Sequence, residues 1–128
     1  MHSKIENKIA TAILDHAFKI HTELGPGLLE SVYEKCLQYE LIKAGYDAKT
    51  QVSIPLKYKG ISFKDGFRID LLINNKVLVE IKAIENLAPV HFAQTLTYLR
   101  MTNIRLGLLI NFNNKFLKNG IHRVVNNL

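Results

Sequence analysis

The chain has a single cysteine among its 128 residues and no long run of apolar side chains. Cys36 therefore has no partner for an internal disulfide, which fits a reducing cytoplasm, and its amphipathic surroundings predict a buried small side chain rather than a nucleophile. No apolar run approaches the roughly 18 residues that a membrane span needs. The N-terminal residues 1–6 lack the apolar core of a signal peptide, so we expect a soluble, cytoplasmic protein.

Motifs for several common kinds of site are missing as well. The chain has no G-x-S-x-G turn to expose a nucleophilic serine and no Cys/His spacing of a zinc finger. Dense Lys/Arg tracts, internal repeats and low-complexity segments are also missing. These absences argue against covalent catalysis by serine or cysteine and against a zinc-finger module.

Composition indicates one folded unit with a positive surface. Apolar residues make up 48% of the chain, which is enough for one domain over residues 1–128 with a substantial core. Seventeen Lys and Arg residues outnumber eleven acidic residues and give a net charge of +6. Such an excess attracts polyanions at long range, and nucleic acid is the natural candidate.

Hydrophobic periodicity predicts the element order α-α-β-β-β-α-β-β, and hence a mixed α/β fold with helices flanking a sheet. Helices are expected over 5–24 and 28–44, and Gly45 ends the second. The apolar pattern of the second helix consists of Leu29, Val32, Cys36, Leu37, Tyr39 and Leu41. Strands are expected over 51–58, 67–73 entered through 61–63, 76–83, 104–112 and 121–125. A helix over 89–102 would cross over between two parallel strands.

Strands 67–73 and 76–83 form an expected antiparallel hairpin whose register depends on the turn. A two-residue turn at Asn74 and Asn75 would pair Asp70 with Val79 and send Glu80 to the far face. A three-residue connection instead pairs Asp70 with Glu80 and gathers one aliphatic face, made of Ile69, Leu71, Ile73, Val77, Val79 and Ile81. We predict the three-residue connection.

In this register Asp70 and Glu80 oppose each other on a strand face that also carries Lys82 and Arg68. Opposed like charges destabilise a sheet unless a cation lies between them, and oxygen ligands suit Mg²⁺ or Mn²⁺. The two acids and Lys82 thus form the core of a metal-dependent phosphodiesterase site. A charged strand face that is simply solvated is the alternative. Arg68 is the best placed basic residue for a phosphate contact.

Three short motifs then point to a known family. The segment 27–33, Gly-Leu-Leu-Glu-Ser-Val-Tyr, matches G-x-x-E-x-x-Y. Over nearly its whole length the chain closely resembles the GxxExxY protein family of the PD-(D/E)XK nuclease superfamily. Asp70 and Glu80-x-Lys82 match the superfamily signature, and Gln94-x-x-x-Tyr98 matches the Q-x-x-x-Y element of its recombination-nuclease branch. The resemblance implies a restriction-endonuclease-like fold. It also implies an enzyme that hydrolyses DNA phosphodiesters with Mg²⁺ or Mn²⁺ and an activated water.

The resemblance also implies roles for individual residues. Asp70, Glu80 and the backbone carbonyl of Ile81 would hold the metal, while Lys82 would orient the water or stabilise negative charge. Glu30 would be an outer metal ligand, with an acid that interacts with the helix dipole as the alternative. Gln94 would contact a phosphate or the attacking water, and Tyr98 would support Gln94. Tyr33 would pack in the core or support the site indirectly.

Other residues leave alternatives open. His91 is assigned either to a substrate contact or to capping of the helix at 89–102. Tyr58, Phe63 and Phe67 are expected to pack in the core or on the sheet surface rather than to stack on bases. DNA is the expected partner, and a homodimer would bring two sites to two strands. The competing function is a non-catalytic nucleic-acid- or protein-binding module on the same fold, although opposed carboxylates repel phosphate and so argue against it.

Overall fold

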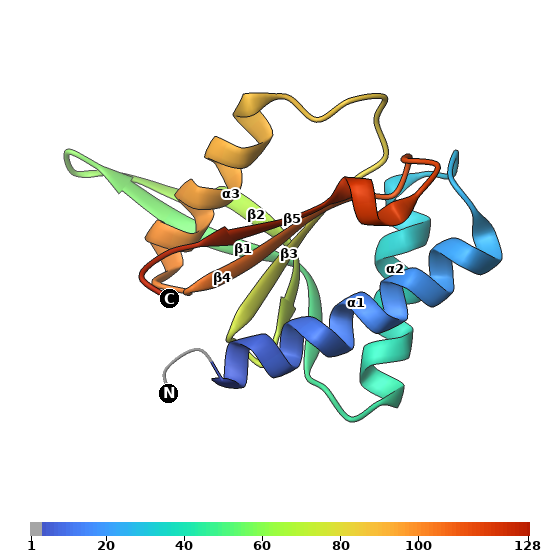
Figure 1. Cartoon of the computed structure of the whole chain (residues 1–128). Helices are drawn as coiled ribbons and strands as arrows, with labels where there is room; N and C mark the ends of the chain where they lie inside the picture. The colour runs from blue at the N-terminus through green and yellow to red at the C-terminus, as the bar shows by residue number, and fades with distance from the viewer. Residues whose placement is uncertain (1–3) are drawn as a thin grey trace.

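The computed structural model describes residues 4–128; residues 1–3, part of the N-terminal segment considered for a signal peptide, lie outside that range (Figure 1). The elements are α1 (Lys4–Leu24), α2 (Glu30–Lys43), β1 (Ala48–Tyr58), β2 (Ile61–Ile73), β3 (Val77–Lys82), α3 (Pro89–Thr102), β4 (Leu106–Asn111), a 3-10 helix η1 (Leu117–Gly120) and β5 (Ile121–Val125). The predicted mixed α/β order is confirmed, and η1 is an addition to it. No helix within residues 4–128 is long and apolar enough to cross a membrane.

The five strands form one mixed sheet in the order β1-β2-β3-β4-β5. Strands β3 and β4 are parallel and are joined by α3, while the other neighbouring pairs are antiparallel. This confirms the crossover expected from the sequence. Figure 1 shows α1 and α2 on one face of the sheet and α3 on the other. Two buried clusters correspond to these layers, the larger beneath α1 and α2 and the smaller beneath α3.

Helix α2 buries only part of the apolar pattern predicted for it. Leu37 and Leu41 enter the core as predicted, whereas Leu29, Val32 and Tyr39 are 73%, 37% and 62% exposed, so their assignment to the buried face is wrong. Tyr33 takes their place, and Tyr33, Leu37 and Leu41 are spaced by four residues. The sequence offers two overlapping apolar stripes, and the stacking of Tyr33 on Phe112, with ring centroids 4.5 Å apart, favours the second.

The turn between β2 and β3 has three residues, as predicted. Ile73 pairs with Val77 and Leu71 pairs with Val79, and the amide of Lys76 donates to the carbonyl of Ile73 at 2.9 Å. Asn74 and Asn75 both have a left-handed backbone, with φ of 51° and 54°, which asparagine tolerates better than most residues. The α1/α2 core receives five of the six residues of the predicted aliphatic face, namely Leu71, Ile73, Val77, Val79 and Ile81.

Ile69 is the exception, because it packs with Leu99 and Ile104 beneath α3. The alternation of faces therefore breaks between Ile69 and Leu71, and the prediction is wrong at this one position. The cause lies on the neighbouring strand. Gln51, between the pairs Thr50–Leu71 and Val52–Ile69, has a left-handed φ of 50° inside β1 and interrupts the ladder there.

Strands β1 and β2 also extend well beyond the rest of the sheet. Only Leu71, Leu72 and Ile73 of β2 pair with β3, so the preceding part of β2 pairs with β1 alone. We call residues 52–69 the β1–β2 arm; Figure 1 shows it projecting, in green, past α3. The register shifts at Pro55, opposite a bulge at residues 64–66. A side chain on Gly66 would clash with Leu56, so glycine fits this bulge.

Candidate active site

Asp70 and Glu80 meet where β2 and β3 separate. The backbone amide of Ile81 donates to Asp70 Oδ2 at 2.8 Å, and the backbone amide of Asp70 donates to Glu80 Oε2 at 3.0 Å. These side-chain bonds begin directly after the last regular pair, Leu71–Val79. Asp70 is half-buried, and Glu80 is only 4% exposed. The end of the hairpin is thus held together by the two carboxyl groups.

The electrostatics of this pair disfavour two negative charges. Burial, followed by the negative charge of Asp70, raises the pKa of Glu80 to about 8. Burial also raises the pKa of Asp70 above its ordinary value. The ammonium of Lys82 acts in the opposite direction, because its positive charge lowers the pKa of both carboxyls from beyond ion-pair distance. The structure therefore brings Asp70, Glu80 and Lys82 together.

Helix α2 supplies two more carboxylates to the same place. Glu30 Oε2 accepts a hydrogen bond from the amide of Ala83 at 3.1 Å, just past the end of β3. Glu34 is 8% exposed, and its Oε1 accepts a hydrogen bond from Gln51 Nε2 at 2.7 Å. Burial raises the pKa of Glu34, and the charges of Asp70 and Glu30 add to the effect. The cavity between α2 and the strands has a volume of about 540 Å³, and its lining includes Glu30, Glu34, Gln51, Asp70, Ile81 and Ala83.

Glu34 and Gln51 were not among the site residues expected from the sequence. Glu34 follows Glu30 by four residues and so lies one turn further on the same helix face, a signal that was present in the sequence. Gln51 gave no comparable signal, because a left-handed residue inside a strand cannot be recognised from a polar side chain alone. Its amide nitrogen lies 3.4 Å from Asp70 Oδ1 and thus links β1 to both acids.

The residues of the Q-x-x-x-Y element lie on the α3 side of the acids. Burial raises the pKa of Tyr98, the negative charges of Glu80 and Asp70 raise it further, and a hydrogen bond with Gln94 lowers it. Tyr98 also stacks on Phe67 of the arm, with ring centroids 4.3 Å apart. Tyr98 is thus held against the arm by Phe67, within range of the charges of both acids and next to Gln94 on α3.

His91 and Arg68 lie outside this cluster. The ring Nδ1 of His91 accepts a hydrogen bond from the amide of Ala88 at 2.8 Å, and the amide of His91 donates to the carbonyl of Ala88. This is the capping arrangement considered as the alternative to a substrate contact. Arg68 is exposed on the arm opposite Ser53 and does not line the cavity.

Tyr33 fixes the segment that leads into the Glu30 helix. Its hydroxyl donates to the carbonyl of Gly25 at 2.6 Å and accepts from the amide of Leu28 at 3.1 Å, while its ring is fully buried. Gly27, between these partners, has a φ of 96° that favours glycine. The Gly27–Glu30–Tyr33 motif therefore works as a clamp that sets where α2 begins.

The donor groups suit a hard divalent ion. Within residues 4–128, no three His, Cys, Asp or Glu side chains converge closely enough in this structure to hold one metal ion together. The acidic groups around the cavity nevertheless all offer carboxylate oxygens, from Glu30, Glu34 and Asp70, and Glu80 adjoins Asp70. Carboxylate oxygens are what Mg²⁺ and Mn²⁺ prefer, and a cation would relieve the repulsion between Asp70 and Glu80. By this chemical test the residues fit such an ion.

Comparison with known proteins agrees with this chemistry. A family model described as the PD-(D/E)XK nuclease superfamily matches residues 7–124. The chain belongs to the PD-(D/E)XK nuclease superfamily. Members of this superfamily are generally nucleases that use divalent metal ions, so membership indicates a nuclease-type function with a nucleic-acid substrate. No curated protein and no solved structure matches the chain significantly.

Proposed function

We propose that this PD-(D/E)XK chain is a Mg²⁺- or Mn²⁺-dependent nuclease that hydrolyses DNA phosphodiester bonds with an activated water. The observation that carries the proposal is the meeting of Asp70 and Glu80 where β2 and β3 separate, with the positive charge of Lys82 acting on both. A fold gains no stability from burying two neighbouring acids, whereas a divalent ion makes such a pair favourable. Gly27, Glu30 and Tyr33 match the G-x-x-E-x-x-Y motif and support the proposal that the chain is a member of the GxxExxY family.

Each residue of the site receives a role in this proposal. Asp70 and Glu80, with the backbone carbonyl of Ile81, hold the ion, and Glu30 adds an outer ligand from α2. When bound, the ion supplies a water of lowered pKa and neutralises charge on the phosphate. Lys82 orients the attacking water or stabilises the negative charge that develops on the phosphate oxygens.

The α3 side positions the substrate. Gln94 carries an amide that can hold a phosphate oxygen or the attacking water, and its hydrogen bond to Tyr98 fixes the orientation of that amide. Because water is the nucleophile, the proposed mechanism forms no covalent intermediate between the enzyme and the substrate. Cys36 packs against the α1/α2 core and does not line the cavity.

The test is cleavage of plasmid, single-stranded and branched DNA, with RNA in parallel, in Mg²⁺, in Mn²⁺ and in EDTA. We expect activity with either ion and none in EDTA. Asp70→Asn, Glu80→Gln and Lys82→Ala should each lower the rate by about 100-fold or more. Glu85→Gln is the matched control, because Glu85 is exposed and follows the same strand without lining the cavity.

Two outcomes would contradict the proposal. Cleavage that persists in the Asp70 and Glu80 variants would reject this site. Failure to bind Mn²⁺ at millimolar concentration, together with no cleavage of any of these substrates, would favour the non-catalytic binding module on a nuclease fold.

A further inference from the structure

The β1–β2 arm has two faces of different chemistry. Side chains alternate between the two faces along each strand, and residues that are paired across β1 and β2 lie on the same face. One face is polar and contains the pairs Lys57–Ser62 and Ser53–Arg68. The other face is apolar and contains the pairs Tyr58–Ile61, Leu56–Phe63, Ile54–Phe67 and Val52–Ile69.

Only the base of the apolar face is covered. Ile69 is fully buried and Phe67 stacks on Tyr98 of α3, whereas Tyr58, Ile61 and Phe63 are 59%, 55% and 45% exposed. Phe67 thus packs as expected, whereas Tyr58 and Phe63 lie on the surface of the sheet and do not enter the core. The reason is that the outer half of the arm projects beyond α3, as Figure 1 shows.

The arm as a whole is strongly basic. The arm has a single acidic residue, Asp65, against four basic residues, Lys57, Lys59, Lys64 and Arg68. The ammonium of Lys59 lies 5.5 Å from the centroid of the Tyr58 ring. Lys57 and Arg68 lie on the polar face, so the arm carries cations on both sides of its uncovered rings. Cationic side chains near uncovered aromatic rings are the combination that binds single-stranded nucleic acid, because phosphates meet the charges and unpaired bases stack on the rings.

The arm also begins at the candidate active site, since Asp70 is the next residue of β2. At roughly 3.3 Å per residue, the stretch from Ile61 to Asp70 spans about 30 Å. A nucleic-acid strand advances about 3.4 Å per nucleotide, so the arm can follow on the order of eight nucleotides. A mononucleotide or dinucleotide at Asp70 would leave the arm without a contact, whereas a polymer would continue along it.

We propose that the β1–β2 arm binds a single-stranded segment of nucleic acid beside the bond to be cut. Its basic residues contact the phosphates, and Tyr58 and Phe63 stack on unpaired bases. This inference rests on the proposed nuclease function and adds a substrate class to it: a strand with an unpaired tract of several nucleotides on one side of the reacting phosphate, rather than a continuous duplex.

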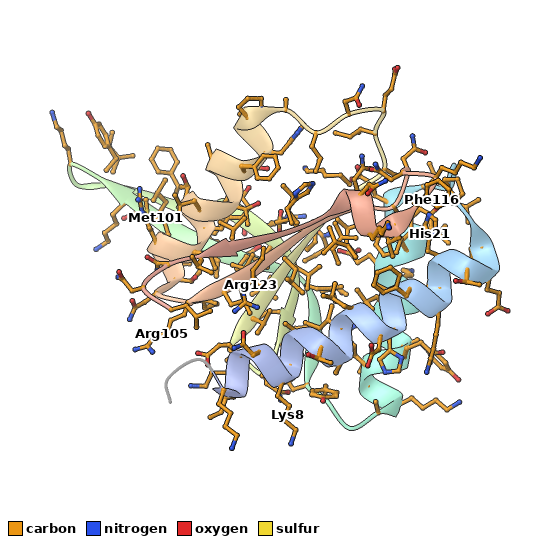
Figure 2. All side chains as sticks on the ribbon, viewed as in Figure 1. Lys8, His21, Met101, Arg105, Phe116 and Arg123 are labelled. Carbon is orange, nitrogen blue, oxygen red and sulfur yellow. The ribbon has the colours of Figure 1, made fainter. Side chains whose placement is uncertain are left out.

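The experiment measures binding without cleavage. Fluorescence anisotropy in EDTA gives the dissociation constants for a labelled 12-nucleotide single strand and for the corresponding blunt duplex. The variants are Tyr58→Ala/Phe63→Ala and Lys57→Gln/Lys59→Gln. Matched controls are Phe116→Ala and Lys115→Gln/Lys118→Gln, because Phe116 is 60% exposed and Figure 2 shows it at the opposite end of the molecule from the arm.

We expect wild-type protein to bind the single strand more tightly than the duplex. The aromatic double variant should weaken single-strand binding by at least about tenfold and change duplex binding by less than about twofold. The lysine double variant should reduce the slope of log K against log salt by about 1.4, or roughly 0.7 for each phosphate that a lysine no longer neutralises. The controls should bind like the wild type, and thermal melting should show that all variants fold.

The inference and the proposed function fail in different ways. A preference of the wild type for duplex, or unchanged single-strand binding in both arm variants, would overturn the inference and leave the nuclease proposal to the cleavage assay. Conversely, Asp70→Asn should retain single-strand binding, because Asp70 is not part of the arm. If the arm binds as expected but no metal-dependent cleavage is found, the nuclease proposal fails and the binding surface remains.

Discussion

The amide of Gln51 donates a 2.7 Å hydrogen bond to Glu34 and lies 3.4 Å from the carboxylate of Asp70. One neutral side chain from β1 thus stands between an acid of α2 and an acid of β2. Its backbone is left-handed, which costs a residue other than glycine about 1–2 kcal/mol. Such strain is kept where the position of a side chain matters, and it suggests a direct experiment.

Replacing Gln51 by glycine should relieve the backbone strain and remove the amide. Because the bond from Gln51 lowers the pKa of Glu34, that pKa should rise in Gln51→Gly, which NMR titration of the Glu34 carboxyl carbon can follow. We expect the melting temperature to change by only a few degrees, since relief of strain offsets the missing hydrogen bond. Gln38→Ala is the control, because Gln38 bonds to the Ala48 carbonyl instead. A lower Glu34 pKa in Gln51→Gly would contradict this account.

The stability of the metal-free protein should fall as the pH rises from about 5 to 8. Glu80 has a folded pKa of about 8, above its ordinary value of 4.5, so folding favours its protonated form. Its contribution to stability is complete below pH 4.5 and is lost as the pH rises through the folded pKa. Urea denaturation in EDTA should show this loss, on the order of 3 kcal/mol, relative to Glu80→Gln, which cannot titrate. Parallel pH profiles of the two proteins would contradict the prediction.

Lys82 should contribute more to cleavage than its positive charge alone. Its removal in Lys82→Ala should raise the pKa of Asp70 and Glu80 further and weaken Mn²⁺ binding, because protons then compete better with the ion. Lys82→Arg should restore Mn²⁺ affinity to within about threefold and leave cleavage about 100-fold below wild type. Calorimetric titration and cleavage rates measure the two effects separately. Full cleavage by the arginine variant would show that charge is sufficient.

Tyr33→Phe should loosen the start of α2 without disturbing the core. The phenylalanine ring keeps the stacking on Phe112 but leaves the Gly25 carbonyl and the Leu28 amide without their partner. We expect a loss of about 1–3 kcal/mol in the free energy of unfolding and weaker Mn²⁺ binding, because Glu30 follows directly. Tyr39→Phe is the control: Tyr39 is 62% exposed, and the change should cost less than about 0.5 kcal/mol. Equal stability of the two variants would refute the clamp.

The pairing of Asp70 with Glu80 could be predicted because the turn allowed only one register that kept aliphatic residues together. Leu71, Ile73, Val77 and Val79 enter the core in that register, so the burial of the hairpin fixed the relative placement of the acids. The extent of α3 also followed from local signals, since Pro89 begins it as expected and its C-cap at Asn103 lies just past the predicted end.

Features that depend on tertiary neighbours could not be read in the same way. Helix α2 carries two apolar stripes, and only its contact with Phe112 determines that Tyr33 rather than Val32 faces the core. The exposure of Tyr58 and Phe63 depends on where α3 ends in space, which no property of β1 or β2 reveals. The interruption at Gln51 lies in the backbone, where its φ is left-handed, and Ile69 therefore packs in the layer beneath α3.

The turn at Asn74, Asn75 and Lys76 has a consequence for how this chain can change. Exchanging either asparagine for glycine would preserve the left-handed backbone and keep the acids opposed. Losing a single residue there would shift one strand against the other by one position and separate the acids, although neither of them had mutated. At this hairpin the length of the loop is therefore more tightly constrained than its composition, and deletion of one loop residue would separate the two carboxylates.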